Sequence, residues 1–187
     1  MSEFVYSRSY RGGVKALVLD WSGTTVDAYV VAPAVVFVAA FGKQGVEISM
    51  AEARGPMGLR KDLHIKALTE DPAIRERWNG VHGSYPDQAD VDAMFADFVP
   101  MQLDCLRAYA DLLPGVADVV GRLQARGIKI GSSTGFIRVM VDILEDEAAK
   151  QGYRPDASVA GDDVIHGARP APHMVYRNLD LMGVHQI

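Results

Sequence analysis

The sequence has little of what extracellular, membrane-bound or nucleic-acid-binding proteins use. A single cysteine, Cys105, excludes an internal disulfide and favours a reducing compartment, so we expect a cytoplasmic protein. No apolar run is long enough to cross a membrane, and residues 1–13 lack the apolar centre of a signal peptide, which indicates a flexible tail. The net charge is -5 and no dense Lys/Arg run is present. We therefore expect no membrane and no nucleic-acid partner, while a small phosphorylated substrate remains compatible.

What is present is an ordinary globular composition, with 187 residues of which 49% are hydrophobic and 23% charged. Ala16 to Leu19 form a short apolar run without alternation, which is typical of a strand buried on both faces of a parallel sheet. Further strands are predicted over residues 128–133 and 157–160, each followed by a helix. The fold class is therefore α/β, with a doubly wound, Rossmann-like parallel sheet.

Between the first two predicted strands, residues 29–110 contain only helical patterns. They include an apolar helix predicted from Ala34 to Gly42 and a short helix predicted to start at a capping box of Ser49 and Glu52. Such a stretch is too long for a simple crossover and indicates an inserted α-helical cap domain. The α/β core domain is then expected over residues 14–28 and 111–187. A strand buried on both faces also needs neighbours on both edges, and three strands leave one neighbour missing. We therefore expect that the sequence is a fragment or that a partner supplies the missing strand.

Asp20 is the first polar residue after the opening strand. Ligands of open α/β sheets bind beyond the carboxyl ends of the strands, where this carboxylate is expected to lie. The turn that follows, from Gly23 to Thr25, has N–H groups and hydroxyls suited to a phosphate. The pattern predicts phosphoryl transfer to Asp20, although an aspartate that only initiates a turn after a strand is an open alternative.

Three segments resemble, in order, the first three motifs of the haloacid dehalogenase superfamily: Asp20 with Trp-Ser-Gly-Thr-Thr, the turn Ser132 to Gly135, and the Gly-Ala-Arg-Pro loop from Gly167. The segment from Ala53 to His64, with its Pro-Met-Gly-x-x-Lys-x-x-His block, resembles the cap signature of the phosphonoacetaldehyde hydrolase family, the phosphonatases. The resemblance covers residues 14–184 and implies hydrolysis of the P–C bond of phosphonoacetaldehyde to acetaldehyde and phosphate.

The resemblance implies a mechanism in which Lys61 forms a Schiff base with the aldehyde and Asp20 accepts the phosphoryl group. Most phosphatases of the superfamily carry a second aspartate, as acid for an oxygen leaving group, where this chain has Ser22. An iminium leaving group needs no such acid, so the substitution favours the phosphonatase reading. His64, one helical turn after Lys61, is expected to move a proton through a water, and Met57 to lower the pKa of the lysine by desolvation.

The resemblance also implies a phosphate-binding set. Thr134 is expected to hold a phosphoryl oxygen and Arg169 to balance its charge. The turn residues Ser22, Gly23 and Gly135 are expected to complete the set.

A Mg²⁺ cofactor is implied, held by the Asp20 carboxylate, the Ser22 backbone carbonyl and an acidic residue of a fourth strand. That acidic residue is absent here, because the sequence stops where the fourth strand of the family pattern should begin. The resemblance therefore implies a C-terminally truncated chain, and it further implies a homodimer formed through the cap.

Phe136 departs from the family, because phosphonatases have a tyrosine after the Ser-Thr-Gly turn. A proton-relay role at this position is therefore in doubt. Two alternatives to a phosphonatase remain open. One is a different capped phosphohydrolase that acts on a phosphate ester, and the other is a catalytically silent, truncated chain that keeps only the fold.

Overall fold

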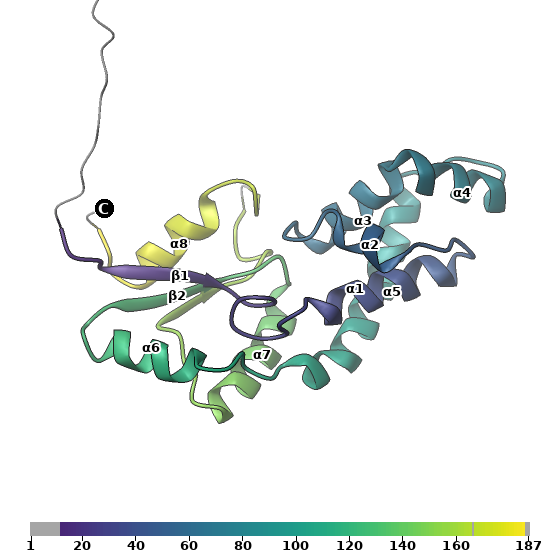
Figure 1. Cartoon of the computed structure of the whole chain (residues 1–187). Helices are drawn as coiled ribbons and strands as arrows, with labels where there is room; N and C mark the ends of the chain where they lie inside the picture. The colour runs from purple at the N-terminus through teal and green to yellow at the C-terminus, as the bar shows by residue number, and fades with distance from the viewer. Residues whose placement is uncertain (1–11, 166, 186–187) are drawn as a thin grey trace, which may run out of the picture.

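Three parallel strands form one sheet in the order β1 (Ala16–Asp20), β2 (Lys129–Ser133) and β3 (Ala157–Val159). The structure is a computed structural model that describes residues 12–165 and 167–185. Helices α6 and α7 lie on one side of the sheet and α8 on the other (Figure 1). This arrangement confirms the predicted doubly wound α/β fold. The tail expected over residues 1–13 lies almost wholly outside the described residues.

The helices of the described residues follow the predicted order. They are α1 (Val31–Lys43), α2 (Met50–Arg54), α3 (Lys61–Glu70), α4 (Pro72–His82), α5 (Gln88–Leu106), the 3-10 helix η1 (Arg107–Tyr109), α6 (Val116–Gln124), α7 (Arg138–Lys150) and α8 (His173–Leu181). Within residues 12–165 and 167–185, no helix is long and apolar enough to span a membrane.

The starts of the inserted helices follow from local capping chemistry. Ser49 and Glu52 form the predicted capping box of α2, and the Asp71 side chain caps α4. Helix α1 begins at Val31, three residues before the predicted start at residue 34. The buried Asp27 carboxylate explains the difference, since it accepts hydrogen bonds of 2.9 Å from the N–H groups of both Val31 and Ala32.

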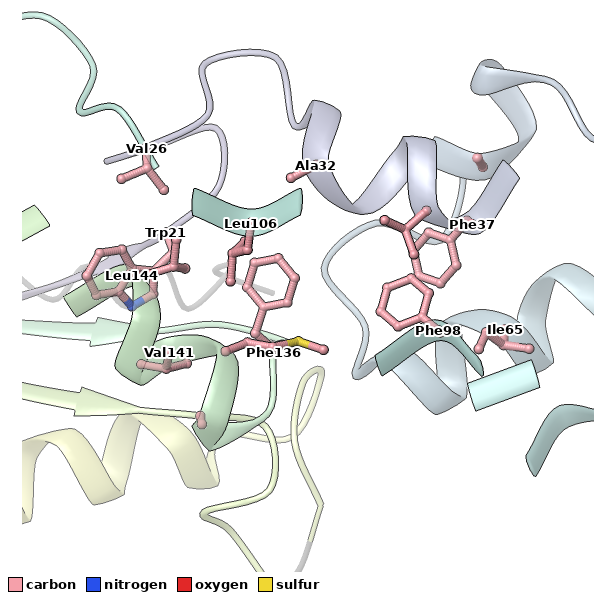
Figure 2. Packing of buried hydrophobic residues seen from close by; sticks show 14 of the residues in the cluster. Trp21, Val26, Ala32, Phe37, Ile65, Phe98, Leu106, Phe136, Val141 and Leu144 are labelled. Carbon is pink, nitrogen blue, oxygen red and sulfur yellow. The ribbon is translucent and has the colours of Figure 1, made fainter. Parts of the chain in front are cut away.

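Helices α1 to α5 lie together beside the carboxyl ends of the strands (Figure 1). Their core is continuous with that of the sheet, because one cluster of buried side chains includes residues of both parts. Figure 2 shows Phe136 between Trp21 near the sheet and the pair Phe37 and Phe98 of the helices. The rings of Phe37 and Phe98 stack with centroids 4.6 Å apart. The inserted helices are thus packed on the core and not merely tethered to it.

Strand β1 differs from the sequence prediction in its burial. Its five residues are only partly buried, whereas β2 is buried from Ile130 to Ser133. The prediction of a strand buried on both faces was therefore wrong. The reason is that β1 pairs with β2 alone, and no strand of the described residues covers its other edge. The sequence analysis did predict that one strand next to β1 would be missing, and the observed sheet agrees with this.

Helix α8 fixes the end of β2 through one side chain. The buried Asn178 amide donates to the Ser132 carbonyl at 2.9 Å and accepts from the Ser132 N–H at 3.2 Å. A Cβ at Gly131 would lie 2.6 Å from the Asn178 Oδ1, so this close approach requires glycine in the strand. The strand end that follows, from Ser133 to Gly135, carries part of the site.

Candidate active site

A small pocket of about 30 Å³ lies where the strand ends meet the inserted helices. Asp20, Ser22, Thr134, Gly135 and Arg169 line it from the sheet side. Seven of the nine residues predicted for the site line this pocket. The complete set of lining residues is Asp20, Ser22, Val30, Pro33, Met57, Gly58, Lys61, Thr134, Gly135, Phe136 and Arg169. Residues far apart in the sequence are thus brought onto one cavity, which is what a site at the carboxyl edge of the sheet requires.

Both oxygens of the Asp20 carboxylate have partners. Its Oδ1 accepts a 2.7 Å hydrogen bond from the Trp21 N–H, and its Oδ2 forms a 2.8 Å ion pair with Arg169. Arg169 is itself held, because its Nη2 donates to the Ser133 carbonyl at 2.6 Å and to the Ser133 Oγ at 2.8 Å. The carboxylate is therefore oriented through Oδ1, and a fixed cation lies at Oδ2, on the side of the pocket.

Lys61 is the first residue of α3, and only 4% of its surface is exposed. Its Nζ lies 4.6 Å from the ring centroid of Phe136 and 5.7 Å from that of Phe37. Burial lowers the pKa of Lys61 from 10.5 to about 8, the nearby Asp20 charge opposes this shift, and the Arg169 charge adds to it. On this basis about a tenth of the amine is neutral at pH 7, far more than for a solvated lysine.

His64 is brought close to Lys61 but does not line the pocket. Its ring stacks on Phe37 with centroids 3.8 Å apart, and its Nε2 lies 2.9 Å from the Ala53 carbonyl oxygen. Since a carbonyl only accepts, Nε2 carries the hydrogen and Nδ1 is a bare acceptor. This Nδ1 is buried without a partner among the described residues. Burial and the Lys61 charge lower the pKa of His64 to about 3, so the ring is neutral at pH 7.

Two hydroxyl groups are available to an anion in the pocket. The Thr134 Oγ1 accepts from the Phe136 N–H at 3.3 Å, which leaves its own proton free to donate. The Ser22 Oγ is buried and has no hydrogen-bond partner among the described residues. Together with Arg169, these groups supply the donors that a phosphoryl group needs.

Gly23 does not line the pocket, so the structure does not support the predicted role in phosphate binding. Its N–H donates to the carbonyls of Val26 and Asp27, at 2.8 Å and 3.0 Å. The N–H groups of Thr24 and Thr25 both donate to the Trp21 carbonyl. These donors close the turn and are not available to a ligand. Gly23 is needed for the turn itself, because its φ is +84°.

The residues of the pocket fit a Mg²⁺ ion only in part. Within residues 12–165 and 167–185, no three His, Cys, Asp or Glu side chains are grouped as a metal site. Asp20 is the carboxylate on the pocket, and the Ser22 carbonyl is a second hard oxygen, a donor set that Mg²⁺ uses together with waters and substrate phosphate. Asp162 and Asp163 are engaged elsewhere, since Asp162 accepts from the Arg138 N–H and Asp163 pairs with the Arg138 side chain.

Several residues of the site were not expected from the sequence, and three of them have a clear role. Ser133 anchors Arg169, Phe37 contacts both Lys61 and His64, and Val30 lines the pocket with a left-handed φ of 53°. Ser133 belongs to the hydroxyl-rich turn that the sequence shows, but nothing in the sequence pairs it with Arg169. Phe37 belongs to an apolar helix whose residues all read as core.

No protein-family model matches the chain. Curated relatives named phosphonoacetaldehyde hydrolase do match, among them a 46% identical protein of Syntrophobacter fumaroxidans that aligns with 95% of this chain. Others are from Nitratidesulfovibrio vulgaris, 44% identical over 99% of this chain, and Bacillus cereus, 47% identical over 92%. The chain spans 64%, 66% and 65% of the lengths of these three relatives.

One solved structure supports the same family, and a second shows the same fold. A phosphonoacetaldehyde hydrolase-like protein from Oleispira antarctica is 32% identical, with a TM-score of 0.92 over 98% of this chain and 67% of that one. A putative phosphoglycolate phosphatase from Lactobacillus delbrueckii, 20% identical with a TM-score of 0.70 over 91% of this chain and 74% of that one, shares the fold. The chain belongs to the phosphonoacetaldehyde hydrolase family.

Proposed function

We propose that this chain cleaves the P–C bond of phosphonoacetaldehyde and releases acetaldehyde and phosphate. The observation that carries the proposal is the position of Lys61, a buried lysine of the inserted helices that lies on the same pocket as Asp20 of the sheet. The names of the relatives support the substrate class. The separate origins of the two residues support a division into a cap over residues 29–110 and a core over residues 14–28 and 111–187.

A carbanion is a poor leaving group, and imine formation by Lys61 allows the carbon to leave as an enamine instead. The neutral Lys61 amine attacks the aldehyde carbon, water is lost, and the protonated imine becomes an electron sink. When the P–C bond breaks, its electron pair moves into the C=N⁺ group and gives an enamine. The enamine then takes a proton on carbon, and hydrolysis of the resulting iminium frees acetaldehyde and Lys61. The lowered pKa of Lys61 supports the first step, because only the neutral amine is a nucleophile.

Asp20 is the proposed acceptor of the phosphoryl group. Its Oδ1 is engaged by the Trp21 N–H, so Oδ2 is the oxygen that forms the new O–P bond. Arg169 pairs with Oδ2 in the free protein, and the phosphonate oxygens would take over this cation together with the hydroxyl of Thr134. Water then cleaves the aspartyl phosphate. Ser22, in place of a carboxylic acid, suits a reaction whose leaving group needs no proton at the moment of cleavage.

His64 is proposed as a proton acceptor and not as an acid. Its pKa of about 3 keeps the resting ring neutral, so it would hold a proton from Lys61 only transiently, and its Nδ1 is the ring nitrogen without a partner among the described residues. A Mg²⁺ ion would be held by the Asp20 carboxylate and the Ser22 carbonyl. Bound there, it would neutralise charge on the phosphoryl group.

The test of the proposal is to trap the imine. The chain is incubated with phosphonoacetaldehyde and borohydride, and the reduced adduct is located by peptide mapping, with Lys66 of the same helix as internal reference. We expect the adduct on Lys61 and none in a Lys61→Met variant. Phosphate release is measured in parallel with added Mg²⁺. An adduct confined to other lysines, in a folded protein, would refute the Schiff-base step.

The same measurements separate the alternatives. Equal phosphate release from a phosphate ester by the wild type and Lys61→Met would favour a phosphate-ester phosphohydrolase, because such a reaction needs no amine. Absence of both adduct and phosphate release would favour a catalytically silent chain. Neither alternative explains a buried lysine on the pocket.

We further propose a homodimer through the cap and a cytoplasmic location. Leu63, Val81 and Tyr85 are large apolar side chains exposed on the cap, and covering them would remove apolar surface from water. The free and partly buried Cys105 is compatible with a reducing compartment. The molar mass in solution, measured by light scattering, tests the dimer, and a monomer for wild type would refute it.

A further inference from the structure

The segment before Lys61 lies directly on two glycines of the core. A Cβ at Gly135, in the turn after β2, would overlap the Leu59 carbonyl oxygen and lie 2.9 Å from its carbonyl carbon. A Cβ at Gly161, after β3, would lie 3.2 Å from the Arg60 Cγ. Neither glycine has a left-handed φ, so the backbone conformation does not require glycine at these positions. The close approach of residues 58–60 instead excludes a side chain at Gly135 and leaves little room for one at Gly161.

The two glycines form one continuous surface. Gly161 donates its N–H to the Phe136 carbonyl at 2.7 Å, and a Cβ at Gly161 would lie 3.3 Å from the Gly135 carbonyl oxygen. Both residues are buried. We name Gly135 and Gly161 together the glycine seat.

The segment on the seat is held in a defined shape. The Arg60 guanidinium forms two hydrogen bonds with the Asp62 carboxylate, the one from Nε being 2.6 Å long. The charge of Asp162, next to Gly161, also favours the cationic arginine and raises its pKa. The Arg60 carbonyl accepts the His64 N–H at 2.8 Å, which starts the helix that carries Lys61. The distance between the segment and the seat therefore sets how far Lys61 reaches into the pocket.

We propose that the glycine seat positions Lys61 over Asp20 by allowing residues 58–60 to lie in backbone contact with the core. Gly135 and Gly161 are positioning residues in this respect, and a methyl group on either one lifts the segment and uncovers the lysine. The catalytic consequence rests on the proposed function, but the placement of Lys61 does not.

The test measures how well Lys61 is shielded, without substrate. The folded protein is treated briefly with acetic anhydride, and the acetylation of Lys61 is quantified by peptide mapping relative to the half-exposed Lys66. We expect Gly161→Ala to raise the labelling rate of Lys61 about threefold and Gly135→Ala about tenfold or more, the latter corresponding to about 1.4 kcal/mol. Gly135→Ala has the larger effect because its Cβ would overlap the Leu59 backbone, whereas the atoms nearest a Cβ at Gly161 lie 3.2 Å away or more.

A second variant and a matched control identify the cause. Gly161→Ala combined with Arg60→Ala removes the Cγ that the new methyl meets and leaves only the carbonyl oxygens of Gly135 and Phe136, each at 3.3 Å, so labelling should fall toward the rate of Arg60→Ala alone. Gly121→Ala in α6, where a Cβ meets nothing within 4 Å, should label as the wild type does.

Two outcomes overturn the proposal. One is wild-type labelling of Lys61 in folded Gly161→Ala, which decides the matter even if Gly135→Ala does not fold. The other is raised labelling in Gly161→Ala that Arg60→Ala leaves unchanged, because the effect would then not act through contact between the seat and residues 58–60. If borohydride trapped no adduct on Lys61 of the wild type, by contrast, the proposed reaction would be refuted. The proposal about the glycine seat would not be affected.

Discussion

Lys61 lies in an environment far from that of an ordinary, solvated lysine. Its amine lies between two aromatic rings, and no carboxylate of the described residues forms an ion pair with it. Cation–π contact with Phe136 and Phe37 offsets part of the cost of desolvating a charged amine. Such a group is destabilising in the folded protein, which is common for residues kept for chemistry.

We predict that Lys61→Met stabilises the protein. A pKa lowered from 10.5 to about 8 corresponds to at most about 3 kcal/mol, which Lys61→Met should add to the free energy of unfolding at pH 7. Between pH 8 and 10.5 only the unfolded lysine is protonated, so the stability of the wild type should rise with pH in this window and approach that of the variant. Urea unfolding at pH 7 and pH 10 measures both effects.

The exposed lysine Lys66 provides the control for this comparison. Lys66→Met should change the free energy of unfolding by less than about 0.5 kcal/mol at either pH. Equal stability of the wild type and Lys61→Met at pH 7 would contradict the burial penalty.

Gly23 gives a second prediction at this scale. An alanine there adopts a left-handed φ and places its Cβ 2.8 Å from a Val30 methyl group, so Gly23→Ala should cost about 1–2 kcal/mol. Adding Val30→Ala should recover only the steric part. Thermal unfolding measures both variants, with Gly80→Ala in α4 as a stabilising control of about 0.5–1 kcal/mol. If folded Gly23→Ala bound inorganic phosphate more weakly than the wild type, a role of Gly23 in phosphate binding would be supported after all.

Among the elements, α2 is the shortest α-helix of the described residues and depends on its caps and its link to α4. Glu52 accepts from the Ser49 N–H at 2.8 Å and pairs with Arg77 of α4. The Ser49 N–H, followed by Arg77, lowers the pKa of Glu52 to about 2. One carboxylate thus closes the start of α2 and ties it to a neighbouring helix, just before the Pro-Met-Gly segment that leads to Lys61.

We predict that Glu52→Gln lowers the free energy of unfolding by about 1 kcal/mol at pH 7, a typical value for a capping interaction on a solvated surface. Because the folded pKa lies below the unfolded value of 4.5, the stabilisation is complete above pH 4.5 and is lost between pH 4.5 and 2. Denaturant unfolding from pH 7 to pH 2.5 should show the two proteins converging. Glu70→Gln, whose partner Lys66 is half-exposed, is the matched control and should change the free energy of unfolding by less than about 0.5 kcal/mol at pH 7. A constant difference down to pH 2.5 would argue against this role of the charge.

At the scale of the whole molecule, the proposed cap and the proposed core share one hydrophobic cluster. Leu106, at the end of α5, and Phe136, after β2, lie between the apolar residues of the two parts (Figure 2). Domains that share buried side chains are expected to unfold together. We therefore expect the two parts to unfold in a single cooperative transition.

The two tryptophans test this expectation, since Trp21 is buried near the sheet and Trp78 is buried in α4. Trp78→Phe leaves a fluorescence reporter in the core, and Trp21→Phe leaves one in the cap. In each variant we expect the fluorescence and far-ultraviolet circular dichroism transitions to coincide in urea. Fluorescence transitions separated from the overall transition, earlier for the cap reporter, would show that the cap unfolds independently.

The sequence by itself determined the fold class, the order of the elements and most of the site. Apolar runs, capping boxes and glycines act locally, so the helix starts at Ser49 and Asp71 and the strand before Asp20 were predictable. The short motifs around Asp20, Lys61 and Thr134 indicated the chemistry, because phosphoryl transfer and imine formation each need particular side chains.

Only the tertiary structure decided how those side chains are used. Gly23 donates within its own turn and not to a ligand, and His64 packs on Phe37 outside the pocket. The half-buried β1, the Ser133 contact to Arg169 and the glycine seat under residues 58–60 likewise depend on segments far apart in the sequence. Burial, pKa and close backbone contact are properties of what surrounds a residue, and local sequence patterns do not specify those surroundings.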